Sequence, residues 1–228
     1  MIPIYINNRD HLTTTRALVA YLQRIPHTLP IIVDNESTYP PLLEWYAACG
    51  VTVVRVRNLG PRAPWLIRHD LMRDCLYYAV TDSDLDLTGV PLDVFDVLRE
   101  GLERYPDRVK AGLSLEINDL PERLASTHLI RRWEHKFWLS RLDERWWEAG
   151  IDTTFALYRS GWDWPGIFPA LRADRPYTAR HMPWYRMDTE EERYYGEHAN
   201  PEWATWSNWD RPLRTQPARA HVQRMMDE

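Results

Sequence analysis

The sequence predicts one α/β domain with a mostly parallel central sheet flanked by helices. Its 228 residues and 27.2 kDa suit a single large domain with a substantial core. Short apolar segments alternate with helical patterns through the first 86 residues, and the connections between them are short. Polar residues follow each apolar segment. Alternation with short connections favours parallel strands.

The first 86 residues divide into strands and helices in strict alternation. Apolar runs predict strands at 2–6, 30–33, 51–56 and 76–81. Apolar residues at helical spacing predict helices at 12–24, 40–49 and 67–75. Gly50 follows the second helix as a C-cap, and residues 58–61 form a turn.

The remaining residues are less regular. Their pattern predicts helices at 91–105 and 127–145, strands at 110–117 and 153–158, and a short strand near 177–179. We expect residues 1–86 and residues 87–185 to form the two halves of one domain. Residues 186–228 would then be a lid, an acceptor-binding segment or a tail, loosely ordered after Arg211.

Composition excludes several classes of protein. A net charge of −5 argues against a protein that coats nucleic acid through bulk charge. Every apolar run is far shorter than the roughly 20 residues that span a bilayer. The first residues lack the pattern of a signal peptide, so we expect a cytoplasmic protein. Cys49 and Cys75 are too few for a disulfide framework and are expected to be buried thiols.

Polar clusters stand at the ends of the first four predicted strands, at 7–10, 34–37, 58–62 and 82–86. Ligands of open α/β sheets bind beyond the carboxyl ends of the strands. The four clusters are therefore expected to meet in one crevice.

Asp82, Asp84 and Asp86 alternate, so an extended chain would direct all three carboxylates to one side. Neighbouring carboxylates repel unless a cation is present, and oxygen ligands favour magnesium, manganese or calcium over zinc. A solvated loop or a helix N-cap is the alternative. A calcium loop fits poorly, because Leu87 stands where that loop needs glycine and Asp93 where it needs glutamate.

An Asp-x-Asp tripeptide that follows three strand–helix units resembles the motif of glycosyltransferases with the GT-A fold, in their family 2-like branch. Residues 3–9 and 31–37 stand where that family has its proline-tyrosine-asparagine and aspartate-x-x-serine elements. Residues 58–60 are similar to the segment before the motif helix. The resemblance covers residues 1–86 clearly and the rest loosely. It implies a GT-A-like fold in which residues 1–86 form a Rossmann-like nucleotide-binding half and residues 87–185 an acceptor and catalytic half.

The resemblance implies a metal-dependent glycosyltransferase that moves a sugar from a nucleoside-diphosphate donor to a hydroxyl acceptor. It implies Mn²⁺ or Mg²⁺ held by Asp82 and Asp84, with a UDP-sugar as the expected donor. The acceptor would be a glycan, a lipid, a protein or a hydroxymethylated base of phage DNA. Residues that would bind the donor are Asn8, Arg9, Asp34 at the base, Arg62 at a phosphate, and Ser83.

The same resemblance suggests roles for later residues. His181 would complete the metal site, and Trp184 would support a sugar unless it packs in the core. Asp152 is the first candidate for the general base of an inverting enzyme. Asp119 is the second, and it would otherwise bind the donor sugar. A capping or turn role is the alternative for both acids, and the stereochemical outcome stays open.

Two other functions remain open at this stage. A sugar nucleotidyltransferase also handles diphosphates, but its glycine-rich, lysine-bearing loop is missing from residues 1–24. A noncatalytic, calcium-dependent carbohydrate-binding module could use residues 82–86 and exposed tryptophans. Residues 131–138 are basic with aromatic residues interleaved, which predicts an amphipathic helix or an acceptor surface for a phosphate-bearing partner.

Overall fold

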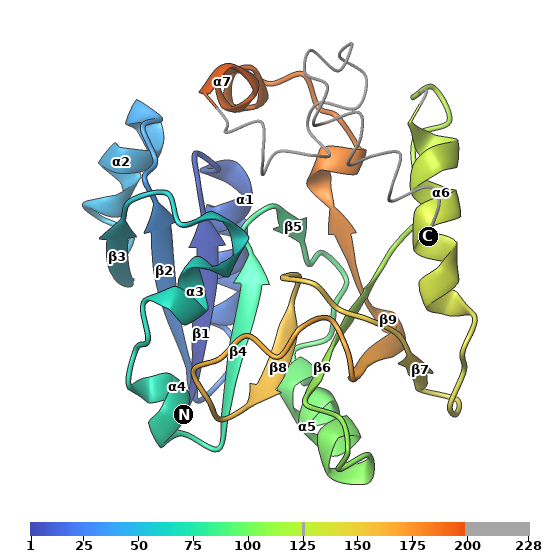
Figure 1. The fold of residues 1–228 in the computed structure, drawn as a ribbon. Helices are drawn as coiled ribbons and strands as arrows, with labels where there is room; N and C mark the ends of the chain where they lie inside the picture. Colours follow the sequence, from blue (N-terminus) through green and yellow to red (C-terminus); the bar gives the residue numbers. More distant parts are fainter. Residues whose placement is uncertain (125, 199–228) are drawn as a thin grey trace.

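A central sheet organises the computed structural model, which describes residues 1–124 and 126–198 (Figure 1). Its strands are β1 (Ile2–Asn8), β2 (Thr28–Asn35), β3 (Thr52–Val56), β4 (Tyr77–Asp82), β5 (Leu85–Asp86), β6 (Lys110–Leu115), β7 (Trp146–Glu148), β8 (Ala156–Arg159) and β9 (Ala170–His181). Within the described residues, eight strands follow the order β3-β2-β1-β4-β8-β6-β9-β5, and β7 pairs with β9. The predicted α/β fold is confirmed.

The N-terminal half is parallel throughout. β1 pairs in parallel with β2 and β4, and β2 pairs in parallel with β3. The connections contain α1 (Thr13–Leu22), α2 (Pro40–Tyr46), α3 (Ala63–Leu66) and α4 (Leu71–Asp74), with a 3₁₀ turn, η1 (Gly60–Arg62), before α3. All four predicted strands of this half are present. Their carboxyl ends therefore meet at one edge of the sheet.

The second half of the sheet is mixed. β8 runs antiparallel to β4 and β6, whereas β6 and β9 are parallel. The register of β6 and β9 shifts between Leu113 and Ser114, so β9 pairs on both sides of residues 174–177. The short strand predicted near 177–179 is thus the last part of a 12-residue strand. This length returns the chain to the carboxyl ends of the N-terminal strands.

Two of the predicted helices are wrong in extent. The helix predicted at 67–75 is interrupted between α3 and α4, where Arg68 has a φ of 47°. The helix predicted at 127–145 ends early, as α6 (Thr127–His135) followed by the 3₁₀ turn η2 (Lys136–Trp138). Asp143 accepts hydrogen bonds from the amides of Arg145 and Trp146, which turns the chain into β7. Burial of Trp146 against the sheet outweighs helix propensity here.

Alternate residues of the strands face two apolar layers. Ile4 and Ile6 of β1 pack with α1 and with α5 (Val94–Arg104) on one face of the sheet. Tyr5 lies on the opposite face with residues of α3 and α4. The period of two that predicted β1 therefore reflects burial on both faces.

Two composition-based expectations can be compared with the structure. Among the described residues, no helix combines the length and the apolar character needed to cross a membrane. Cys49 and Cys75 are free thiols, but each is only partly buried, so the expectation of fully buried thiols was wrong.

Gly101 of α5 packs directly against the ring of Trp146, so a substitution there tests the packing of the core. A Cβ built at Gly101 would lie 2.6 Å from Cη2 of Trp146, a fully buried ring. Gly-to-Ala changes inside helices normally stabilise by up to about 1 kcal/mol, whereas overpacking costs about 1–3 kcal/mol. We expect Gly101→Ala to lower the free energy of unfolding by about 1–2 kcal/mol, measured by urea denaturation.

Glu103→Ala is the matched control, because Glu103 is exposed on the same helix. It is expected to change the free energy of unfolding by less than about 0.5 kcal/mol. A Gly101→Ala protein that is more stable than the wild type would contradict the packing described here.

Candidate functional site

The polar clusters predicted to converge do meet at the carboxyl ends of β1, β2 and β4. The Asn35 side-chain amide donates to the carbonyl of Gly60 at 2.7 Å, and its oxygen accepts from the amide of Leu59 at 2.7 Å. The amide of Ser83 donates to the carbonyl of Asn7 at 3.2 Å. Asn35 also donates to Oδ1 of Asn7 at 3.3 Å, so the clusters after all four parallel strands are joined. Ligands of open α/β sheets bind at this edge.

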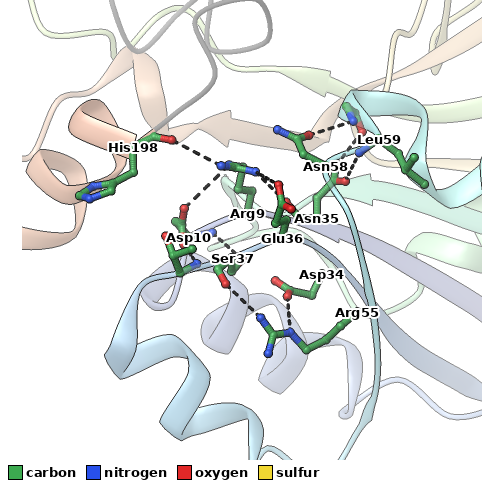
Figure 2. A network of polar contacts seen from close by, with 12 residues as sticks. Arg9, Asp10, Asp34, Asn35, Glu36, Ser37, Arg55, Asn58, Leu59 and His198 are labelled. Carbon is green, nitrogen blue, oxygen red and sulfur yellow. Dashed lines mark hydrogen bonds and ion pairs between the residues drawn. The ribbon is translucent and has the colours of Figure 1, made fainter.

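Arg9 is central to the contacts at the ends of β1 and β2 (Figure 2). Its guanidinium donates to the carbonyls of Asn35 at 3.0 Å and His198 at 3.4 Å. The carboxylates of Asp10 and Glu36 lie 3.9 and 3.8 Å away. Arg9 therefore joins two strand ends to the C-terminal helix α7 (Glu190–His198).

Asp34 is fully buried, and both of its carboxylate oxygens have partners. The Tyr46 hydroxyl lies 3.1 Å from Oδ1, and Arg55 donates to Oδ2 at 2.9 Å (Figure 2 shows the Arg55 contact). Asn8 donates to the Tyr46 oxygen at 2.8 Å, so Tyr46 connects the two residues. Among the described residues, the buried Oδ1 of Asn8 has no hydrogen-bond partner. Asn8 thus retains an unused acceptor in this crevice.

The alternation of the acidic segment agrees with the structure. Ser83, Leu85 and Leu87 are buried, whereas Asp82, Asp84 and Asp86 are partly exposed. Asp86 separates from the other two, because it accepts from the amide of Thr88 at 2.8 Å and lies 3.9 Å from Arg180. Asp82 and Asp84 are left as the pair.

His181 reaches this pair from the far end of the chain. β5 pairs with β9, which sets Leu85 opposite His181, and Nε2 of His181 lies 3.4 Å from Oδ2 of Asp84. Burial would lower the pKa of His181, but Asp84, Asp82 and Glu134 outweigh it and raise this pKa. Burial opposes ionisation of Asp84, yet His181 lowers the Asp84 pKa overall. Asp84 and His181 therefore form an ion pair.

Asp82 is in a different state. Burial, and then the charges of Asp84 and Asp152, raise the pKa of Asp82 to about 8, although a hydrogen bond from Thr153 at 2.8 Å favours its ionised form. Without a cation, Asp82 is therefore largely protonated at neutral pH. Two adjacent carboxylates with limited access to solvent cannot both ionise cheaply.

Asp152 lies beside this pair and reaches solvent. Burial by the surrounding protein nevertheless raises its pKa, while Lys110, Arg62 and Arg172 oppose the rise. The Arg62 guanidinium stacks 3.8 Å from the centre of the Trp164 ring. The structure thus brings together Asp82, Asp84, His181, Asp152 and Arg62 from four separate parts of the sequence.

Two predicted site residues have other surroundings. Asp119 is exposed and accepts hydrogen bonds from Arg180 and Tyr185, both at 2.6 Å. Burial raises the pKa of Asp119, but the two hydrogen bonds outweigh it and lower this pKa overall. Trp184 is 2% exposed and packs edge-on against His181, with ring centres 4.9 Å apart. It therefore supports His181 from behind instead of presenting an open face.

Helix α7 lies over the ends of β1 and β2 and was not predicted as a helix (Figure 1). The Glu191 carboxylate accepts from the amides of Leu12 at 2.9 Å and Thr13 at 3.0 Å, and the Tyr195 ring stacks on His11 at 4.4 Å. No side chain next to α1 caps its first turn. Glu191 supplies that cap from 178 residues away, which no local pattern announces.

The donor atoms suit a divalent cation only in part. Within the described part of the chain, no three His, Cys, Asp or Glu side chains are grouped closely enough to hold a metal ion. However, Oδ1 of Asp84 and Nδ1 of His181 are buried without a hydrogen-bond partner among the described residues. Carboxylate and imidazole are ligands for manganese. An ion here would need further oxygen ligands from a substrate.

Comparison with known proteins finds only weak structural similarity. No protein-family model and no curated protein matches the chain. A crystal structure of 4-diphosphocytidyl-2C-methyl-D-erythritol synthase is 12% identical, with a TM-score of 0.43 over 86% of this chain and 96% of that one. The apo form of mouse xyloside xylosyltransferase 1 is 13% identical, with a TM-score of 0.31 over 69% of this chain and 66% of that one. At these TM-scores neither likeness bears on function.

Asp82 should make stability depend on pH when no cation is bound. Its pKa is raised from 3.8 to about 8, so the folded protein holds a proton that the unfolded chain releases between these values. The Asp82 contribution to stability is therefore lost as pH rises through this window. Asp82→Asn removes the dependence and keeps an acceptor for Thr153. In EDTA at pH 8 the free energy of unfolding of Asp82→Asn should be higher than that of the wild type by at least about 1.4 kcal/mol, the equivalent of one pKa unit.

The measurement is urea denaturation of both proteins from pH 5 to pH 8. Asp86→Asn, which alters a carboxylate outside the pair, is the control and should show no such widening with pH. An Asp82→Asn difference that stays constant across the range would contradict the assignment.

Proposed function

We propose that this protein is a metal-dependent glycosyltransferase that transfers a sugar from a nucleoside-diphosphate donor to a hydroxyl acceptor. The observation that carries the proposal is the grouping of Asp82, Asp84, His181 and Asp152 at the carboxyl edge of the parallel strands. In this reaction the paired carboxylates and the histidine would bind the metal ion. The separate acid, which reaches solvent, would accept the proton of the acceptor. The resemblance of residues 1–86 to GT-A glycosyltransferases supports the same reading.

Asp84 and His181, together with Asp82, would hold Mn²⁺ or Mg²⁺. The ion supplies Lewis-acid stabilisation of the negative charge that develops on the departing diphosphate. Oxygens of the diphosphate would complete a ligand set that the protein alone leaves short. The raised pKa of Asp82 supports this role, because a cation would allow both carboxylates to ionise.

The crevice between β1 and β2 would bind the nucleotide part of the donor. Asn8 offers an unpartnered buried oxygen there, and Arg9 and Asp34 line the same region. Arg62 is exposed and lies near enough to Asp152 to lower its pKa, and there it can pair with a phosphate. The Arg–Trp164 stack holds this guanidinium in place.

Asp152 would act as the general base. Its carboxylate reaches solvent beside the metal-binding pair, and burial raises its pKa, which makes it a stronger base than an ordinary aspartate. Nearby cations keep it ionised and ready to accept a proton. It would take the proton of the acceptor hydroxyl while that oxygen attacks the anomeric carbon and the nucleoside diphosphate leaves.

The rival functions differ from this one in measurable ways. A calcium-binding module would use Asp86 with Asp82 and Asp84, but Asp86 is engaged with the Thr88 amide. A nucleotidyltransferase would release pyrophosphate, whereas a glycosyltransferase releases a nucleoside diphosphate. Product identification by chromatography separates these two reactions.

Asp84→Asn should abolish transfer and manganese-assisted donor binding. The change removes the charge that pairs with His181 and one ligand of the ion. We expect turnover to fall by at least about 100-fold, measured as released nucleoside diphosphate over a panel of donors and acceptors. Asp86→Asn, two residues away, is the control and should retain most of the activity. Undiminished turnover of Asp84→Asn would refute the metal assignment.

Asp152→Asn should separate catalysis from donor binding. We expect kcat to fall by about 100-fold or more, because a general base contributes factors of this size, while the affinity for donor and manganese is retained. Kinetics and isothermal titration measure the two quantities. A collapse of donor affinity would instead assign Asp152 to the donor-binding shell.

A further inference from the structure

Three consecutive backbone carbonyls before and at Asp152 accept hydrogen bonds from cationic side chains. Nε of Arg172 lies 2.8 Å from the oxygen of Gly150. Nζ of Lys110 lies 2.5 Å from the oxygen of Ile151 and 3.5 Å from the oxygen of Asp152. Lys110 also donates to the carbonyl of Gly166 at 2.6 Å, which fastens a second part of the same loop.

Both cations come from the interior of the sheet. Lys110 begins β6 and is fully buried, and Arg172 of β9 is 4% exposed. Arg172 is also ion-paired with Glu134 of α6, itself 1% exposed. Burial of an ammonium or guanidinium group is costly unless its donors are satisfied. Burial lowers the pKa of Lys110 to about 7, so its carbonyl partners offset only part of the cost of its charge. Glu134 pairs with the guanidinium of Arg172.

The surrounding contacts leave this segment little freedom. A Cβ at Gly150 would lie 2.9 Å from the Phe168 ring, so the chain passes close to that ring. Thr153, the next residue after Asp152, donates its hydroxyl to Asp82 at 2.8 Å. Residues 150–153 are thus held at every position, and the Asp152 side chain is the part that reaches solvent.

We propose that Lys110 and Arg172 are positioning residues that clamp the backbone of residues 150–152 and hold the Asp152 carboxylate in place for proton transfer. The inference rests on the proposed function, since it assigns these cations to the placement of its general base. A base must lie within hydrogen-bonding reach of the acceptor hydroxyl, and small displacements cost large factors in rate.

The clamp also sets the charge around Asp152. The groups that act on this carboxylate are Lys110 from β6, Arg172 from β9, Arg62 from η1 and Asp82 from β4. The three cations favour its ionised form against burial, whereas Asp82 disfavours it when charged. Removal of Lys110 would therefore raise the pKa of Asp152.

The test compares Lys110→Met with Arg99→Met in the full chain. Arg99 is an exposed cation on α5, and its ion pairs are with Asp96 and Glu103 of the same helix. Methionine keeps the length of the lysine side chain and removes its charge. Arg172→Lys is a second variant that keeps the charge and releases Gly150, in case Lys110→Met does not fold.

Two readouts are measured for each variant. Hydrogen–deuterium exchange of peptides that cover residues 149–155 reports the clamp and does not depend on activity. Steady-state kinetics against pH report its effect on catalysis. For Lys110→Met we expect faster exchange at residues 150–153, a kcat about 10- to 100-fold lower, and an acid limb of the kcat profile at higher pH. The donor KM should stay within about 2-fold, and Arg99→Met should match the wild type.

The outcomes separate the two proposals. Unchanged exchange at residues 150–153 in every folded clamp variant would overturn the clamp. Faster exchange with unchanged kcat and an unmoved acid limb would overturn the positioning of Asp152, because a merely structural role predicts that pattern. If the wild-type protein transfers no sugar, the proposed function fails on its own, and the exchange result still decides whether the clamp exists.

Discussion

The close approach of Asp82 and Asp84 is the constraint on which the rest of the site depends. Two carboxylates at one strand end cannot both be charged in a buried setting without compensation. The structure compensates Asp84 with His181 and leaves Asp82 protonated. Lys110, Arg62 and Arg172 offset the charge of Asp152 nearby. A cation bound by the two aspartates would offset the remaining cost of ionising Asp82. The proposed transferase function assigns Mn²⁺ or Mg²⁺ to that role.

The N-terminal half was predictable because its signals are local. Each parallel strand is a short apolar run bounded by polar residues, and burial on both faces keeps that pattern. The convergence of the strand ends then follows from parallel topology alone, and Asn35 and Ser83 make the contacts that join them. The separation of Asp86 from Asp82 and Asp84 could not be predicted, since it depends on Arg180 of a distant strand.

The second half depends on contacts between remote residues. Trp146 leaves the expected helix because the sheet buries it. Only the end of β9 was predicted as a strand, because residues 174–177 interrupt its pairing with β6. The resemblance suggested His181 as a metal ligand, and that role stays a prediction although the residue lies beside Asp84. Lys110, Arg172 and Glu191 carry no local signal, because their partners are backbone groups elsewhere in the chain. The tail after residue 198 lies outside the described residues.

Joint binding of a nucleoside diphosphate and manganese is the property to measure first. Isothermal titration of the wild-type protein with UDP, in manganese and in EDTA, measures whether the ion and the diphosphate bind together. We expect UDP to bind tightly in manganese and much more weakly in EDTA, with the difference lost in the Asp84→Asn protein. Equal UDP affinity in both buffers, or stabilisation by calcium without any nucleotide effect, would rule out a metal-dependent donor site.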